Sequence, residues 1–103
     1  MKKINIGNGK IEAPEIGLGC MRITGLDNEK EIRALIDTAM EEGIYFFDHA
    51  DIYGKGVCEE LFGKVLKAQP SLRKDMLIQS KCGIHRSETT HYDFSRDYIL
   101  HCV

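Results

Sequence analysis

The sequence predicts a parallel α/β fold, and three features of the chain point to it. Short apolar segments rich in β-branched and aromatic residues recur about thirty residues apart, centred on Leu18, Phe46 and Ile78. Amphipathic stretches with helical spacing lie between them, and polar or glycine-containing loops separate the segments. Strands that alternate with helices in this way are typical of a sheet built from βαβ units. The spacing does not by itself distinguish a closed eight-unit barrel from an open doubly wound sheet.

The chain begins with a predicted β-hairpin over residues 2–13. Polar and apolar residues alternate on either side of Asn8-Gly9, and an Asn-Gly pair between such segments is a strong hairpin signal. After Pro14, the apolar run over residues 16–19 predicts a buried strand. A polar loop follows as far as Gly25.

The first helix and the second strand are predicted next. Asn28, with Glu31 three residues later, forms a capping-box pattern that predicts a helix start. Apolar residues then recur at helical spacing, and Gly43 is placed to end the helix. Residues 44–47 form a continuous apolar run, as expected for a strand that is covered on both faces. Asp48 follows this strand directly.

The last third of the chain repeats the pattern. A second amphipathic helix is expected to end at Gln69-Pro70, and residues 76–80 predict a third strand, which Lys81 follows directly. Ser95 is placed to cap a third helix, whose apolar pattern is still incomplete at Val103. Because a helix cut off in mid-pattern is unstable alone, we expect these residues to be part of a longer polypeptide or a truncated product.

Composition argues against several classes of function. The 103 residues are 43% hydrophobic and 29% charged, which is typical of a globular protein. A formal net charge of −2 argues against binding to nucleic acid or to an anionic membrane surface. The sequence contains neither a membrane-spanning apolar run nor a signal peptide, so we expect a cytoplasmic protein.

The four cysteines and four histidines are too scattered to predict a metal site. We therefore expect no metal, and thiols that are reduced and structural. A cysteine nucleophile is disfavoured because no local feature would lower a thiol pKa. Residues 17–22 lack the third glycine of a dinucleotide-binding turn, and no Gly-Lys-Ser/Thr motif occurs, which argues against the common phosphate-binding loops.

Asp48 and Lys81 each come directly after a predicted parallel strand. The carboxyl ends of parallel strands meet at one face, where the functional residues of α/β proteins gather. The two side chains are therefore either a partly buried ion pair with a functional role or two solvated loop charges. Position at a strand end leaves both interpretations open.

Three segments make the interpretation more specific: residues 43–54 (GIYFFDHADIYG), 58–63 (CEELFG) and 80–83 (SKCG). Together they resemble the signature of the aldo-keto reductase family, in particular a bacterial branch of predicted oxidoreductases. The resemblance covers essentially the whole chain. It implies a partial TIM (β/α)8 barrel, with about three βα units preceded by the hairpin. Residues 1–103 would then be the N-terminal part of one barrel domain.

The resemblance implies NADPH-dependent reduction of aldehydes or ketones to alcohols by the full-length barrel. Tyr53 would donate the proton, Lys81 would ease ionisation of the phenol, and Asp48 would anchor Lys81. Cys20 and Met21 match the loop near the nicotinamide, and Asp48 is also expected to contact the cofactor. Cys20 and Met21 can also be read as plain packing residues. The substrate would be a small carbonyl compound.

The resemblance also implies that several parts of the family's site lie outside these residues. The fourth catalytic residue of the family is a His after the fourth strand, and its phosphate-binding loops follow strands seven and eight. His49 should point to the opposite face from Asp48 and cannot replace that His. We expect the 103-residue chain alone to be inactive, to bind NADP(H) weakly and to self-associate through an exposed strand edge. The alternative is an inactive α/β interaction module or the remnant of an enzyme.

Overall fold

A three-stranded parallel sheet forms the centre of the computed structural model, which describes residues 1–86 and 89–103. Asp48 lies in register with Gly19 on one side and with Gln79 on the other. The carboxyl ends of the strands are therefore level, and the predicted parallel order along the sequence is confirmed. The strands, in their order across the sheet, are β3 (Leu18–Gly19), β4 (Phe46–Asp48) and β5 (Leu77–Gln79).

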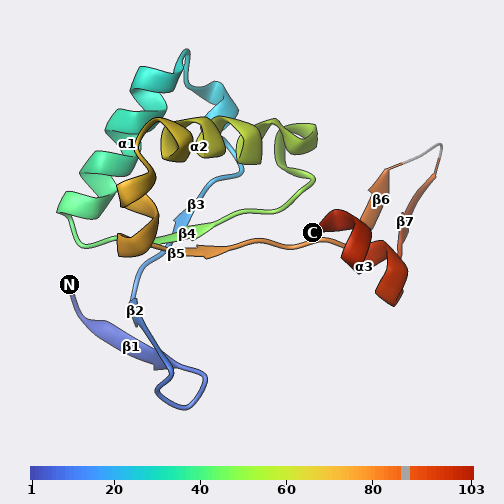
Figure 1. Ribbon diagram of the computed structural model, residues 1–103, viewed down its shortest axis with the longest axis horizontal. Helices are drawn as coiled ribbons and strands as arrows, with labels where there is room; N and C mark the ends of the chain where they lie inside the picture. Colours follow the sequence, from blue (N-terminus) through green and yellow to red (C-terminus); the bar gives the residue numbers. More distant parts are fainter. Residues whose placement is uncertain (87–88) are drawn as a thin grey trace.

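Two helices, α1 (Glu29–Glu41) and α2 (Val57–Ala68), cover one face of this sheet, as Figure 1 shows. Phe47 of β4 is fully buried against them, and its ring centroid lies 5.2 Å from that of Phe62. Burying each large apolar side chain here contributes roughly 1.5–3 kcal/mol to folding. The buried core consists of Cys20, Ile23, Ile32, Ile36, Ala39, Phe47, Cys58, Phe62, Val65 and Met76.

The start of α1 confirms the predicted cap. The Asn28 Oδ1 atom accepts a hydrogen bond from the Glu31 amide at 3.0 Å, and the Glu31 carboxylate accepts one from the Asp27 amide at 2.7 Å. The reciprocal bond thus reaches one residue further back than in the standard capping box. Gly43, with a φ of +81°, lets the chain leave the helix in a left-handed conformation.

The predicted N-terminal hairpin is confirmed as β1 (Lys3–Ile6) paired with β2 (Ile11–Pro14). Asn8 and Gly9 at its tip both have positive φ, as a tight two-residue turn requires. The hairpin projects beyond the amino ends of the parallel strands (Figure 1), where the Tyr45 hydroxyl donates a hydrogen bond to the Glu12 carbonyl.

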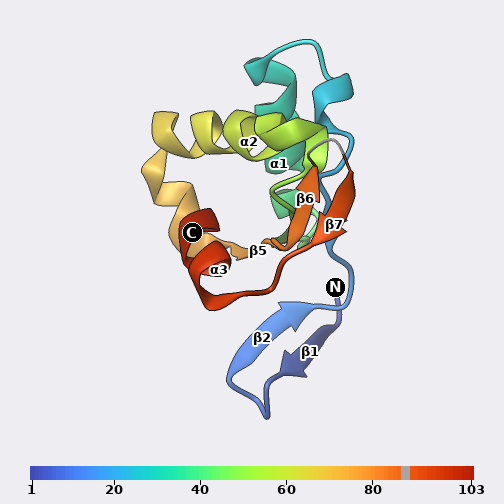
Figure 2. The ribbon, with the colours of Figure 1, turned by 90° about the vertical axis from the view of Figure 1, so that its right-hand side faces the viewer.

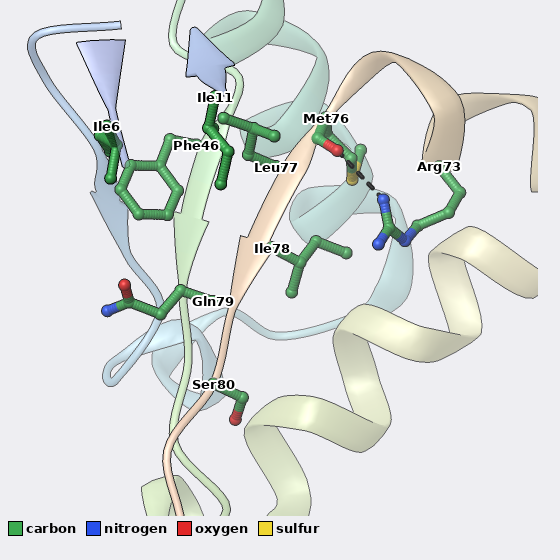
Figure 3. Close-up of a pocket in the computed structure, with 9 residues that line it drawn as sticks. All are labelled: Ile6, Ile11, Phe46, Arg73, Met76, Leu77, Ile78, Gln79 and Ser80. Atoms are coloured by element: carbon green, nitrogen blue, oxygen red, sulfur yellow. Dashed lines mark hydrogen bonds between the residues drawn. The ribbon is translucent and has the colours of Figure 1, made fainter. Parts of the chain in front are cut away.

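The face of the sheet opposite the helices is more open than the sequence predicts. Residues 16–19 were expected to be buried, but Ile16 is 53% exposed and Leu18 is only half-buried. Phe46 is also half-buried, although its strand was expected to be covered on both faces. The reason is that the described residues place two helices on one face and only the N-terminal hairpin near the other. Figure 3 shows the resulting hollow, of about 450 Å³, with Phe46 beside Ile6, Ile11 and Leu77.

A second hairpin, which the sequence did not predict, follows the central sheet. Its strands β6 (Ile84–Arg86) and β7 (Thr90–Tyr92) are antiparallel, short and largely exposed, so no apolar pattern marks them. Figures 1 and 2 place it, with α3 (Arg96–Cys102), beyond the carboxyl end of β5. The predicted Ser95 cap of α3 is confirmed, since its hydroxyl accepts a hydrogen bond from the Tyr98 amide.

We predict that the isolated 103-residue chain self-associates. Among the described residues, β5 pairs with a neighbour on one side only, and apolar side chains such as Ile6 and Ile11 are exposed beside it. An unpaired strand edge next to apolar surface favours contact with another molecule. Sedimentation velocity should therefore show species larger than the 11.7 kDa monomer. A monomer that melts cooperatively at high protein concentration would contradict this prediction.

Candidate active site

An ion pair joins the carboxyl ends of two neighbouring strands. Asp48 is the last residue of β4, and Lys81 lies two residues beyond the end of β5. The Lys81 Nζ atom donates a hydrogen bond of 2.7 Å to Asp48 Oδ1. Nζ also donates to the His49 main-chain carbonyl at 2.6 Å. The ammonium group is therefore held by two oxygen atoms from consecutive residues. Of the two interpretations that the strand-end positions left open, the structure shows the ion pair.

Tyr53 lies next to the same ammonium group. The Lys81 Nζ atom lies over the Tyr53 ring, 5.2 Å from its centroid, which is a cation–π contact. Tyr53 reaches this position through a short loop after β4. Its amide donates to the Ala50 carbonyl, and the Asp51 amide donates to the Lys81 carbonyl. The loop is thus tied to both the strand before it and the residue it approaches.

The charges in this group support one another. The hydrogen bond from Lys81 lowers the pKa of Asp48, partial burial opposes this effect, and a hydrogen bond from Gln79 adds to it. Partial burial lowers the pKa of Lys81, but its hydrogen bond to Asp48 and its interaction with Tyr53 outweigh that effect, so the pKa is raised. Asp48 is therefore a carboxylate and Lys81 an ammonium at neutral pH.

Gln79 belongs to the site, although the sequence analysis did not select it. Its Nε2 atom donates a hydrogen bond of 2.8 Å to Asp48 Oδ1, the same oxygen atom that Lys81 contacts. The two residues face each other because they are register partners in parallel strands. A polar residue in the last position of an otherwise apolar strand was the only signal in the sequence that could have identified it.

The loop that carries Tyr53 continues through three residues with left-handed backbone conformation. Gly54, Lys55 and Gly56 have φ values of +58°, +55° and +92°. A Cβ atom at residue 54 would lie only 3.0 Å from the Thr24 side chain and 3.1 Å from the Cys58 sulfur, so glycine is required there for space as well as for φ. Lys55 adopts this conformation although it is not a glycine.

Cys20 and Met21, the two loop residues that the sequence placed near the cofactor, differ in their surroundings. Cys20 is 1% exposed and belongs to the core, where burial raises the pKa of its thiol to about 12. Its amide donates a hydrogen bond to the Asp48 carbonyl, so the main chain of Cys20 helps to hold the end of β4 in place. Met21 is 57% exposed. Of this pair, Met21 has the side chain that a bound molecule can contact.

His49 points away from Asp48, as an extended strand predicts. Its side chain is 2% exposed and packs edge-to-face on Phe62, with 4.5 Å between the ring centroids. Both ring nitrogens lack a hydrogen-bond partner among the described residues. Burial lowers the pKa of His49, while Glu59 and Asp48 oppose the shift. The imidazole is therefore a neutral core residue behind the site.

The hollow in Figure 3 runs along β5 from Met76 to Ser80, and none of Asp48, Tyr53 and Lys81 lines it. A separate pocket of about 140 Å³ adjoins the group itself, and Tyr53, Lys81 and Ile84 are among its lining residues. No group of three metal-binding side chains occurs among the described residues. None of the helices in that part of the chain is both long and apolar enough to cross a membrane.

The arrangement is chemically suited to transfer one proton to an electron-rich oxygen atom. A phenol is a poor acid near neutral pH, but a neighbouring ammonium group stabilises the phenolate that forms when the proton leaves. The carboxylate and the carbonyl that hold Lys81 keep the ammonium in place. The adjoining apolar pocket offers space for a small molecule next to the phenol.

Comparison with known proteins identifies the family to which this chain belongs. The family model described as Aldo/keto reductase family matches residues 15–103. The uncharacterized oxidoreductase YcsN of Bacillus subtilis is 41% identical over 85 residues, which cover 74% of this chain and 28% of that protein. The uncharacterized oxidoreductase YqkF of the same organism is 33% identical, and the match covers 100% of this chain and 33% of YqkF. The chain thus spans about a third or less of the length of these relatives.

The structural comparison agrees. The holo form of the aldo-keto reductase AKR11C1 from Bacillus halodurans matches with a TM-score of 0.81 and 32% sequence identity. The match covers 99% of this chain and 34% of that one. Because nearly every residue superposes on a part of that structure, the likeness includes the N-terminal hairpin and the region after β5. The expected partial TIM barrel, with three βα units after the hairpin, is confirmed.

We predict that the buried His49 makes the fold sensitive to mild acid. An unfolded histidine has a pKa near 6.5, whereas the pKa of the folded residue is lower. Below pH 6.5 the unfolded state therefore binds more protons, so stability is fully present above that pH and falls as the pH is lowered. The urea midpoint, followed by circular dichroism, should decrease between pH 7 and pH 5.

The variant His49→Leu should lose less stability over the same pH range, because its side chain cannot bind a proton. His101→Gln, which changes an exposed histidine of α3, is the matched control and should behave like the parent chain. Equal acid sensitivity of the parent and His49→Leu would show that His49 is not the group responsible.

Proposed function

The chain belongs to the aldo/keto reductase family, and from this premise we propose that it supplies the proton-donating part of an NADPH-dependent carbonyl reductase. The substrate class would be small aldehydes or ketones, which are reduced to alcohols. The observation that carries the proposal is the position of Lys81 Nζ, which is hydrogen-bonded to Asp48 and lies over the Tyr53 ring. Residues 1–103 would form the N-terminal part of a single barrel domain, and its cytoplasmic location stays a prediction.

The roles we propose follow from the contacts. Tyr53 donates its hydroxyl proton to the carbonyl oxygen as negative charge develops there. Lys81 stabilises the phenolate that remains, and Asp48 and the His49 carbonyl hold Lys81 in place. Gln79 fixes the orientation of the Asp48 carboxylate. These five groups therefore serve one proton transfer, and Tyr53 is the one that meets the substrate.

The described residues fit a nicotinamide ring beside Asp48. Gly19 is the register partner of Asp48, and a Cβ atom at Gly19 would meet no other atom within 4 Å. Met21 is exposed on the loop that follows. Open surface next to a carboxylate and an adaptable thioether suits a flat ring. When bound, the reduced cofactor would supply the hydride, and this chain would supply surface and orientation.

We predict that Tyr53→Phe abolishes most turnover in the full translated chain that carries these residues. The variant keeps the ring and removes the proton donor, so kcat should fall by a factor on the order of 10²–10⁴ while cofactor affinity changes little. NADPH oxidation with a generic aldehyde measures the first quantity, and quenching of NADPH fluorescence measures the second. Tyr45→Phe, which removes an exposed hydroxyl bonded to the Glu12 carbonyl, is the matched control.

Lys81→Met should lower kcat similarly, because it removes the positive charge beside the phenol. Lys64→Met on the surface of α2 is its control, since Lys64 forms only an exposed ion pair with Glu60. Turnover near the parent value in both Tyr53→Phe and Lys81→Met would refute the assignment of the site. The family membership would then stand without these catalytic roles.

We also predict that the 103-residue chain alone has no measurable reductase activity and binds NADPH only weakly. The matched relatives are about three times as long, and in our proposal these residues supply only one side of the cofactor surface. Titration of the purified chain with NADPH, followed by nucleotide fluorescence, should not saturate at micromolar concentrations. Saturation in that range would show that these residues hold most of the cofactor site.

A further inference from the structure

A second hollow, which contains two cationic side chains, shares two lining residues with the pocket beside Tyr53. The first pocket, of about 140 Å³, is lined in part by Asp51, Ile52 and Tyr53. The second hollow, of about 450 Å³, is lined by Asp51, Ile52, Lys55 and Arg86. Because Asp51 and Ile52 line both, the two hollows are neighbours on the same loop.

The cationic residues come from two different elements. Lys55 lies two residues after Tyr53 in the left-handed part of the loop. Arg86 is the last residue of β6, and Ile84, two positions earlier, lines the pocket at Tyr53. Alternate residues of a strand share one face, so a single face of β6 contributes an apolar side chain to the first pocket and a guanidinium to the second.

The second hollow has an excess of positive charge. Lys55 and Arg86 are both exposed, and neither forms an ion pair with another described residue. The acidic residue in the lining is Asp51. Its carboxylate also interacts electrostatically with the side chains of Cys82 and of Tyr98, a residue of α3. Lys81 does not add to this excess, because Asp48 neutralises it.

The backbone at Lys55 gives a second reason to look for a function. Its φ of +55° is a conformation that side chains other than glycine rarely adopt, and both of its neighbours are glycines. Such strain persists where a residue has a use, and it gathers at binding and catalytic sites. A lysine in this position, beside a pocket and without an ion-pair partner in the described part of the chain, points to a ligand that needs its charge.

We propose that Lys55 and Arg86 form an anion subsite next to Tyr53, so that the substrates are aldehydes or ketones that also carry a carboxylate or phosphate group. This inference rests on the proposed reductase function and specifies its substrate class. A guanidinium binds either anion through paired hydrogen bonds, and an ammonium adds a point charge without geometric demands. The reacting carbonyl stays at Tyr53, and the anion fixes the other end of the molecule.

Matched substrates test the proposal in the full translated chain. The carboxylate pair is 4-oxobutanoate and its neutral methyl ester, and the phosphate pair is glyceraldehyde 3-phosphate and glyceraldehyde. We expect kcat/KM to be about tenfold higher for the better anionic member, mainly through KM, and the preference to shrink with added salt. The pair with the larger ratio identifies which anion the subsite takes. Equal kcat/KM values within both pairs would overturn the proposal.

The variants Lys55→Gly and Arg86→Gln should each remove most of this preference and leave the neutral substrates unchanged. Glycine adopts a φ of +55° without strain, so Lys55→Gly removes the charge without endangering the fold. Lys55→Arg should restore part of the preference. Lys64→Gln, a charge change on the exposed side of α2, should leave it intact. A preference that survives both Lys55→Gly and Arg86→Gln would overturn the assignment.

A binding measurement separates this inference from the proposed function. Amide chemical shifts near Lys55 and Arg86 should move on titration with succinate or inorganic phosphate, move little with neutral succinamide, and lose the response in Lys55→Gly. This result without any aldehyde turnover would support the anion subsite and refute the reductase proposal. Turnover of neutral aldehydes with no anion response would refute the subsite and support the reductase. A chain that shows neither would refute both.

Discussion

The pairing of β4 and β5 in parallel register is the constraint on which the site depends. Because Asp48 lies opposite Gln79, the next turn of chain after β5 brings Lys81 to the same carboxylate. One oxygen atom of Asp48 then accepts hydrogen bonds from both residues. A shift of β4 by one residue would turn Asp48 toward the helices and His49 toward the open face, because side chains alternate along a strand. The buried contact between Phe47 and Phe62 makes such a shift costly.

The same alternation separates two kinds of polar residue that are neighbours in the sequence. Asp48 faces the side of the sheet where the ion pair forms, and His49 is buried on the side of the helices. Even so, the main chain of His49 serves the site, because its carbonyl accepts a hydrogen bond from Lys81. The ammonium group thus meets a carboxylate and a carbonyl without needing a second acidic side chain. The core behind it remains apolar apart from a neutral imidazole.

Several elements followed from local sequence chemistry. The Asn8-Gly9 turn, the Asn28 cap and the Ser95 cap each involve residues close together in the chain, so their signals are complete within a few positions. The β6–β7 hairpin was missed because its short, exposed strands have no apolar alternation. The burial expected for residues 16–19 was wrong for a different reason. An apolar run shows that a face is available for packing, but it does not show that the described residues supply a partner for it.

The sequence by itself determined the order of strands and helices as far as β5, and it placed Asp48 and Lys81 at strand ends and Tyr53 shortly after Asp48. Those statements depend on periodicity and on neighbouring residues, which a linear chain records directly. The tertiary structure decided that Gln79 shares an oxygen atom with Lys81, that Cys20 is buried while Met21 is exposed, and that Lys55 and Arg86 border one hollow. Each of these facts concerns either contacts between residues that are far apart in the chain or a difference in burial between adjacent residues. Their physical cause is register and packing, which arise only when the strands and helices meet.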